Sequence, residues 1–247
     1  MAKLQFHNLT LGYERHPAVH HLNGTVERGA LLAVVGPNGA GKSTLFKGVA
    51  GALKPLAGTI DRDGLDAGQI AYLPQLAEID RSFPISLYDM VAMGLMRAKG
   101  PFGGITAKDH HIIEHAIEAV GLTGFEQRAI GTLSGGQMQR MLFARLLVQD
   151  APIIVLDEPF AAIDERTATD LLRLVGRWHD EGRTVLAALH DIDLVRTHFP
   201  ETLLLAREPV AWGATPKVLT PENLAKARLM CEAFDDSAAA CAMRDVA

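Results

Sequence analysis

The sequence has very little cysteine and no excess of positive charge. Only Cys231 and Cys241 occur among its 247 residues, both near the C-terminus, so a disulfide framework is excluded and a reducing compartment is favoured. The formal net charge of −5 gives no general basic surface, which argues against nucleic acid as a partner. The length is sufficient for a large domain with a substantial core.

Long hydrophobic runs are also lacking. The longest, "APIIVL" and "TVLAAL", are far shorter than the roughly 20 residues that a membrane-spanning helix requires. Charged and polar residues interrupt the first 15 residues, so we predict no secretion signal. Any work at a membrane is therefore expected to proceed through a partner protein.

Strand and helix patterns alternate along much of the chain. The run 31–35, "LLAVV", predicts a fully buried strand, and "PIIVLDEP" and "TVLAALHD" predict two more, separated by a helix. This rhythm is typical of a parallel sheet covered by helices on both faces. Short strands are expected before and after it, including a hairpin within "ETLLLAREPVAWG".

The region of about 86–148 has a different, helical texture and predicts an inserted subdomain. One of its helices has an apolar face that includes Ile113 and Ile117, and Thr106 and Asp109 have the spacing of a capping box at its start. We therefore interpret 1–224 as one α/β domain carrying this insertion. Residues 225–247, which lack clear periodicity, are expected to form a C-terminal tail.

The segment 36–44, "GPNGAGKST", matches G-x-x-x-x-G-K-[ST] between a buried strand and a helical run. Its glycines permit a tight loop whose N–H groups face phosphates, Lys42 reaches the β- and γ-phosphate oxygens, and Ser43 can bind Mg²⁺. A glycine-rich turn without a ligand does not explain lysine followed by serine. The predicted phosphate-binding residues are Gly36, Pro37, Asn38, Gly39, Ala40, Gly41, Lys42, Ser43 and Thr44.

Two adjacent carboxylates follow the apolar strand "IIVLD". Asp157 ends the strand, where it can be directed at the Mg²⁺ of the phosphate site. Glu158 comes next, and we expect it to polarise the attacking water as general base. Two solvated acids at a strand end are the alternative, which the nearby phosphate motif makes improbable.

The stretch "LSGGQMQR" contains two glycines where a helix begins. Ser134 and Gln137 have capping-box spacing, yet Gly135 and Gly136 then occupy the first turn, where each costs up to about 1 kcal/mol relative to alanine. Bare glycines at a helix N-terminus let an anion approach its free N–H groups. These residues are therefore predicted to bind an anion.

Together, the phosphate loop, "LSGGQ" and "LDEP" closely resemble the ATP-binding-cassette family of transporter ATPases, and the resemblance extends from Leu4 to about residue 224. It implies a P-loop NTPase core with an antiparallel β subdomain and an inserted helical subdomain, and an ATPase that uses ATP and Mg²⁺.

The resemblance also implies roles for four further residues. Gln75 in "YLPQ" corresponds to the glutamine that contacts Mg²⁺ or the attacking water, and His190 in "ALHD" to the histidine near the γ-phosphate. Asp164 matches the aspartate after the catalytic acids, and Tyr13 the aromatic that stacks on adenine. The alternatives are a polar strand end for Gln75, a satisfied histidine for His190, a helix cap for Asp164 and a core aromatic for Tyr13.

In this family two cassettes pair head to tail, so that the "LSGGQ" segment of one subunit closes on the γ-phosphate held by the other. The resemblance thus implies a homodimer with ATP between its subunits, and two equivalent sites. Hydrolysis would release the subunits.

The segment "YLPQLAEIDRSFPISLYDMVAMG" and the methionine in "LSGGQMQR" resemble cassettes of zinc, manganese and iron-chelate importers. The resemblance implies separate permease subunits that contact residues 76–96, a periplasmic or extracellular solute-binding protein, and a peripheral position on the cytoplasmic face of the membrane. Zinc or manganese is the expected cargo. An iron chelate, another solute or export are alternatives, as is a soluble cassette acting in cluster assembly or on nucleic acid.

Histidines form two groups that could bind a metal. His111, His115 and Glu118 share one helix face, while His16, His20 and His21 lie in a predicted loop. The favoured interpretation is a solvated polar face for the first group and a loop for the second.

Overall fold

The computed structural model describes residues 3–14, 16–100, 103–161 and 163–232. The strands are β1 (Leu4–Tyr13), β2 (His16–Val26), β3 (Leu31–Val35), β4 (Ala57–Asp61), β5 (Ile70–Leu73), β6 (Ile153–Asp157), β7 (Thr184–Leu189), β8 (Glu201–Ala206) and β9 (Glu208–Ala214). The α-helices are α1 (Lys42–Val49), α2 (Leu87–Ala92), α3 (Met96–Lys99), α4 (Ala107–Ala119), α5 (Gly135–Gln149), α6 (Glu165–Asp180), α7 (Ile192–His198), α8 (Thr215–Val218) and α9 (Pro221–Glu232). Short 3₁₀ turns are η1 (Ala67–Gln69), η2 (Leu76–Glu78), η3 (Met93–Leu95) and η4 (Ile130–Thr132).

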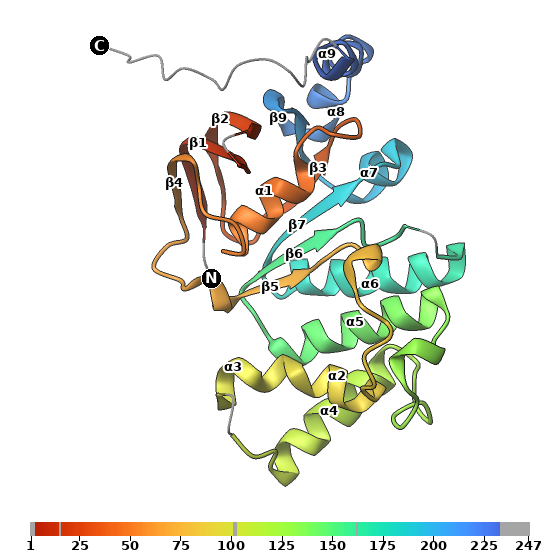
Figure 1. The fold of residues 1–247 in the computed structure, drawn as a ribbon. Coiled ribbons are helices and arrows are strands. Elements are labelled where there is room, and N and C mark those ends of the chain that lie inside the picture. The colour runs from red at the N-terminus through yellow and green to blue at the C-terminus, as the bar shows by residue number, and fades with distance from the viewer. Residues whose placement is uncertain (1–2, 15, 101–102, 162, 233–247) are drawn as a thin grey trace.

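Two sheets organise these elements (Figure 1). The larger has the order β5-β6-β7-β3-β8-β9, parallel throughout except for β9, which pairs with β8 as the predicted hairpin. The smaller is antiparallel, with the order β2-β1-β4. The predicted α/β fold, a mostly parallel sheet with an antiparallel β subdomain, is confirmed.

The larger sheet is buried on both faces because it separates two hydrophobic cores. Strand β3 shows the division: Leu31, Ala33 and Val35 contribute to one core, and Leu32 and Val34 to the other. Alternate side chains of a strand point to opposite faces, so a strand between two cores is apolar at every position. This explains the continuous "LLAVV" run.

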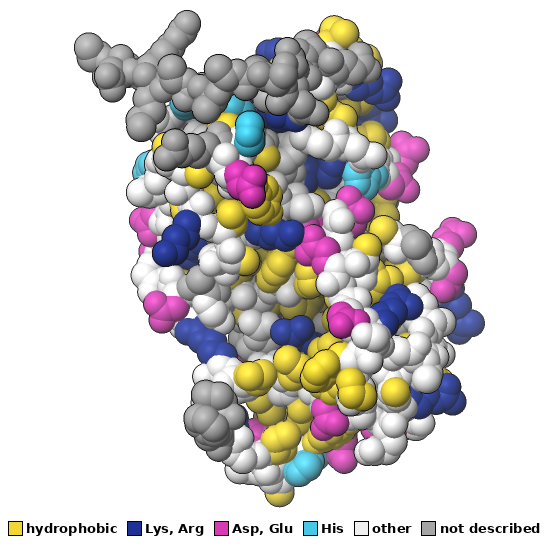
Figure 2. Space-filling view, in the orientation of Figure 1, with side chains coloured by type: hydrophobic (Ala, Val, Ile, Leu, Met, Phe, Trp, Pro, Cys, Tyr) yellow, Lys and Arg dark blue, Asp and Glu magenta, His cyan; other side chains and the backbone are white. Residues whose placement is uncertain are grey.

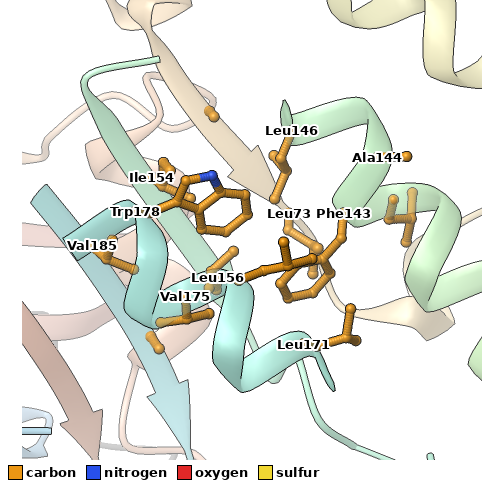
Figure 3. Packing of buried hydrophobic residues seen from close by; sticks show 14 of the residues in the cluster. Leu73, Phe143, Ala144, Leu146, Ile154, Leu156, Leu171, Val175, Trp178 and Val185 are labelled. Atoms are coloured by element: carbon orange, nitrogen blue, oxygen red, sulfur yellow. The ribbon is translucent and has the colours of Figure 1, made fainter. Parts of the chain in front are cut away.

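Helices α5 and α6 cover one face of this sheet. Phe143 of α5 and Trp178 of α6 stack with ring centroids 5.7 Å apart and an interplanar angle of 9°, and Leu73 and Leu156 from β5 and β6 lie beside them (Figure 3). Helix α1 and the inner face of the smaller sheet cover the other side. The carboxyl ends of the strands, which carry the functional side chains, are thus held between two packed layers.

Helices α2, α3 and α4 lie at the end of the molecule away from the smaller sheet, and α5 leads from them to the sheet (Figure 1). The expected Thr106–Asp109 capping box begins α4, with both hydrogen bonds present. Lys99 adds an ion pair of 2.7 Å to Asp109.

Two expectations about local structure are wrong. Regular structure does not end near residue 225, because α9 runs to Glu232 and packs Ala227 into the core; residues 233–247, including Cys241, lie outside the described part. His16, His20 and His21 belong to strand β2 rather than to a loop. Within the described residues, no helix combines the length and hydropathy needed to cross a membrane.

Candidate functional site

The loop 36–41 leads from the end of β3 into α1, beside the carboxyl ends of the neighbouring strands. Gly41 is the N-cap of α1 with a φ of 91°, and a Cβ on it would lie 2.4 Å from the carbonyl oxygen of Ala18. A Cβ on Gly36 would lie 2.0 Å from the carbonyl oxygen of Leu205. Glycine is therefore required at both positions, because neighbouring backbone comes too close for any side chain.

A cavity of about 690 Å³ opens at this loop. It is lined by Ala18, Asn38, Gly39, Ala40, Gly41, Lys42, Ser43, Thr44, Gln75, Glu158 and His190. Most of the residues expected to bind phosphate, together with the three expected to act on it, thus share one cavity. Free N–H groups at the start of α1 give it the polarity of an anion site.

Lys42 is buried, and its Nζ donates to the carbonyl oxygens of Gly36 at 2.9 Å and Pro37 at 3.1 Å. Burial lowers the pKa of Lys42, and the charges of Glu158 and Asp157 partly oppose this shift. These bonds hold the ammonium group within the loop, where its charge is directed at a bound phosphate.

Asp157, Ser43 and Gln75 form a connected cluster at the edge of the cavity. Ser43 Oγ donates to Asp157 Oδ1 at 3.2 Å, and Gln75 Nε2 donates to Ser43 Oγ at 3.1 Å. Asp157 is fully buried, and burial raises its pKa although the bond from Ser43 opposes the shift. A buried carboxylate beside a hydroxyl and an amide fits Mg²⁺, which prefers oxygen ligands and would stabilise the ionised acid.

Glu158 and His190 meet on the other side of the cavity. His190, directly after β7, places Nε2 2.6 Å from Glu158 Oε1. Glu158 has a φ of 51°, in the left-handed region that costs a non-glycine residue roughly 1 kcal/mol or more. This backbone turn separates the direction of Glu158 from that of the buried Asp157 before it.

Ser134, Gly135, Gly136 and Gln137 do not line this cavity. They form the first turn of α5, where Ser134 and Gln137 make the expected capping box with both hydrogen bonds. A Cβ on Gly136 would be 3.6 Å from its nearest neighbours, Asp164 and Thr167, so packing within the subunit does not require glycine there. The bare helix start thus lies outside the cavity of its own phosphate loop.

The remaining predicted residues are placed as follows. Asp164 caps α6 and accepts hydrogen bonds from the backbone and side chain of Thr167, so its alternative role as a helix cap is real. Tyr13 ends β1 and is 49% exposed, which excludes the core alternative and leaves its ring open to a ligand.

The two histidine groups are not arranged as clusters of three or more metal ligands in the described part of the chain. His111 and His115 lie with their rings 6.5 Å apart on the exposed face of α4, consistent with a solvated surface. Among the described residues, no group of three or more His, Cys, Asp or Glu side chains is arranged to hold a metal ion.

Two contacts at the carboxyl end of β6 were not predicted from the sequence. Tyr72 Oη donates to Asp157 Oδ2 at 3.4 Å, and Gln139 Nε2 donates to the carbonyl oxygen of Pro159 at 2.7 Å. The available signal for Gln139 was a polar residue between Met138 and Met141, both buried, on a helix that packs on the sheet. The periodicity alone does not identify its partner.

The fold and the cavity define a P-loop protein that binds a nucleotide at the carboxyl ends of a parallel sheet. The family model described as ABC transporter matches residues 19–161. The chain belongs to this family, as an ATP-binding subunit with ATPase activity.

Similar proteins share most of the chain. A manganese transport system ATP-binding protein from Synechocystis is 39% identical over 213 residues, covering 84% of this chain and 82% of its own length. A zinc transport system ATP-binding protein from Treponema pallidum is 35% identical, covering 91% and 86%. A metal-chelate-type ABC transporter solved in an inward-facing conformation has a TM-score of 0.82 and 30% identity, covering 93% of this chain and 90% of that one.

Proposed function

We propose that the protein is the ATPase subunit of an importer for manganese or zinc. The site cluster formed by Ser43, Gln75, Asp157, Glu158 and His190 carries the ATPase part of this proposal. The likeness to manganese and zinc transport ATPases over more than four-fifths of the chain supports the cargo.

ATP is proposed to bind with its phosphates on residues 36–44 and its adenine on the exposed ring of Tyr13. Backbone N–H groups of the loop and Lys42 hold the β- and γ-phosphates. Mg²⁺ would be held by Ser43 Oγ, Asp157 and Gln75, and it would neutralise part of the negative charge of the phosphates. Gln75 also links the nucleotide to the helical region that begins with η2, because it immediately precedes that turn.

Glu158 is proposed to accept the proton of the attacking water. Its carboxylate is held by His190, which fixes the Oε1 atom and leaves Oε2 free to face the water. His190 itself lines the cavity, so it can contact the γ-phosphate directly. The two acids thus have different roles: Asp157 would bind Mg²⁺, and Glu158 would act as general base for the attacking water.

The site is proposed to be completed by a second copy of the chain. Ser134, Gly135, Gly136 and Gln137 lie outside their own cavity at the start of α5, a helix of 15 residues. The capping box uses the N–H groups of Ser134 and Gln137, which leaves those of Gly135 and Gly136 for an anion. In a two-fold dimer they would cover the γ-phosphate of the partner. Two hydrogen bonds through Thr167 connect Asp164 to Arg140 of α5, and Asp164 would lie at the same interface.

The permease is proposed to dock on the region of 76–96. Phe83 is 61% exposed, and Met93 and Met96 are also exposed; Figure 2 shows hydrophobic side chains gathered over this end of the molecule. Through this contact the protein would work at the cytoplasmic face of the membrane, with a solute-binding protein delivering cargo on the opposite side.

A metal chelate is the second candidate cargo, favoured by the likeness to the metal-chelate-type transporter. Deletion of the chain, followed by measurement of cellular manganese, zinc and iron, distinguishes the two. We expect loss of manganese or zinc accumulation and rescue of growth by the same free metal. Loss of iron-chelate uptake alone would favour the second cargo. Unchanged levels of all three metals would contradict metal import.

A further inference from the structure

Gln139 is a buried polar side chain on the second turn of α5, two residues after the capping box at Ser134 and Gln137. It is 2% exposed, and its Nε2 donates to the carbonyl oxygen of Pro159 at 2.7 Å. A buried amide and a buried carbonyl each cost free energy when they lack a hydrogen-bond partner. This bond supplies a partner to both. It connects the start of α5 to the residue after Glu158.

The backbone that it contacts is unusual. Glu158 has a φ of 51°, and the carbonyl oxygen of Glu158 accepts a hydrogen bond from Ala161 N at 3.2 Å. Pro159 has no N–H of its own to anchor the turn. The carbonyl oxygens of Glu158 and Pro159 are thus held by Ala161 and Gln139, respectively. Such left-handed residues persist where surrounding contacts fix them.

The direction of the Glu158 side chain depends on this turn. Oε1 lies 2.6 Å from Nε2 of His190, and the left-handed φ of Glu158 sets the direction in which its side chain leaves the backbone after the buried Asp157. The turn is closed by the bond from Ala161 N to the carbonyl oxygen of Glu158, and Pro159 lies within it. Rotation of the peptide after Pro159 would therefore also displace Glu158. Gln139 therefore restrains the geometry of a carboxylate that it does not touch.

We propose that Gln139 is a positioning residue for Glu158 and that it couples the two halves of the dimeric site. This inference rests on the proposed role of Glu158 and on the proposed trans contact of residues 134–137. When the start of α5 closes on a phosphate held by the partner, Gln139 moves with the same helix, one turn further along. The position of Glu158 in one site then depends on nucleotide held at the other.

Helix α5 offers a matched control at its other end. Gln149 also donates its Nε2 to a backbone carbonyl, that of Ile70, at 3.3 Å. It is half-buried and lies ten residues, or about three turns, further along the helix, away from Glu158. Methionine keeps the length and helix propensity of glutamine without its donor, so Gln139→Met and Gln149→Met remove comparable bonds.

The test measures steady-state ATP hydrolysis by the full-length protein and its variants. We expect Gln139→Met to lower kcat at least tenfold with KM for ATP changed less than threefold, and Gln149→Met to stay within twofold of wild type. Thermal unfolding is measured for both variants. Unchanged kcat in Gln139→Met, or an equal loss in Gln149→Met at equal thermal stability, would overturn the inference.

A double-mutant cycle separates positioning from general damage. In a Glu158→Gln background, Gln139→Met should cause less than a twofold further loss in single-turnover hydrolysis, because the group that it positions is already gone. A further tenfold loss would assign Gln139 a role unrelated to Glu158. If Glu158→Gln itself hydrolyses ATP like wild type, the proposed function fails instead, and the two failures are thereby distinguished.

Discussion

The Nε2 atom of His190 lies 2.6 Å from Oε1 of Glu158, although 31 residues separate them in the chain. The contact joins the end of β7 to the turn after β6, which are neighbouring parallel strands. His190→Ala should remove this restraint and lower kcat about 10- to 100-fold while ATP still binds. Steady-state kinetics with a nucleotide-binding assay checks this, and His198→Ala, on the exposed end of α7, is the control. Wild-type kcat in His190→Ala would show that the contact has no catalytic role.

Glu158→Gln should abolish nearly all hydrolysis, by about 100-fold or more, because an amide cannot accept a proton from water. The substitution keeps the shape of the side chain and leaves Lys42 and Ser43 in place, so ATP binding should persist. We expect an ATP-bound dimer to accumulate, measured as a doubling of mass by light scattering in the presence of MgATP. Full turnover by this variant would contradict the assignment of Glu158 as general base.

Acid should weaken the fold partly through Asp109. The bonds from Lys99 and Thr106 lower the pKa of Asp109 below its usual value. A carboxyl whose pKa is lower in the folded state stabilises the protein above the unfolded-state pKa of about 4, and that stabilisation disappears as pH falls toward the folded-state value.

Asp109→Asn should therefore lower the melting temperature by a few degrees at pH 7, and the difference from wild type should shrink as the pH falls below about 4. Thermal unfolding measured across this range, with Asp193→Asn on an exposed helix start as control, checks the sign. A difference that grows on acidification would contradict it.

Local patterns were sufficient for much of the fold. The capping boxes at Thr106 and Ser134 involve residues three apart, and the buried run at 31–35 needs only its own composition, so each could be read from a short window. The phosphate loop was also recognisable because its glycines, lysine and serine are contiguous. The mostly parallel sheet followed from the alternation of strand and helix patterns, and the antiparallel subdomain from the family resemblance; the strand order itself was not predicted.

Contacts between segments far apart in the sequence could not be predicted from such short windows. The bond from Gln139 to Pro159 joins residues 20 apart, and only the packing of α5 on the sheet brings them together. Placement of His20 in β2 was missed because its neighbouring histidines and proline do not resemble a strand. The helical character of α9 depends on its packing against β8 and β9 rather than on a strong pattern of its own.

The central claim, that residues 134–137 complete the ATP site of a second subunit, is tested most directly by mixing two inactive variants. Lys42→Ala damages the phosphate loop, and Ser134→Arg blocks the start of α5; each homodimer should hydrolyse ATP at less than about one-tenth of the wild-type rate. A mixed dimer holds one site with an intact loop from the Ser134→Arg subunit and an intact helix start from the Lys42→Ala subunit. We predict that single-turnover hydrolysis returns on mixing. Activity that stays at the level of the separate variants, although mixed dimers form, would contradict the trans arrangement.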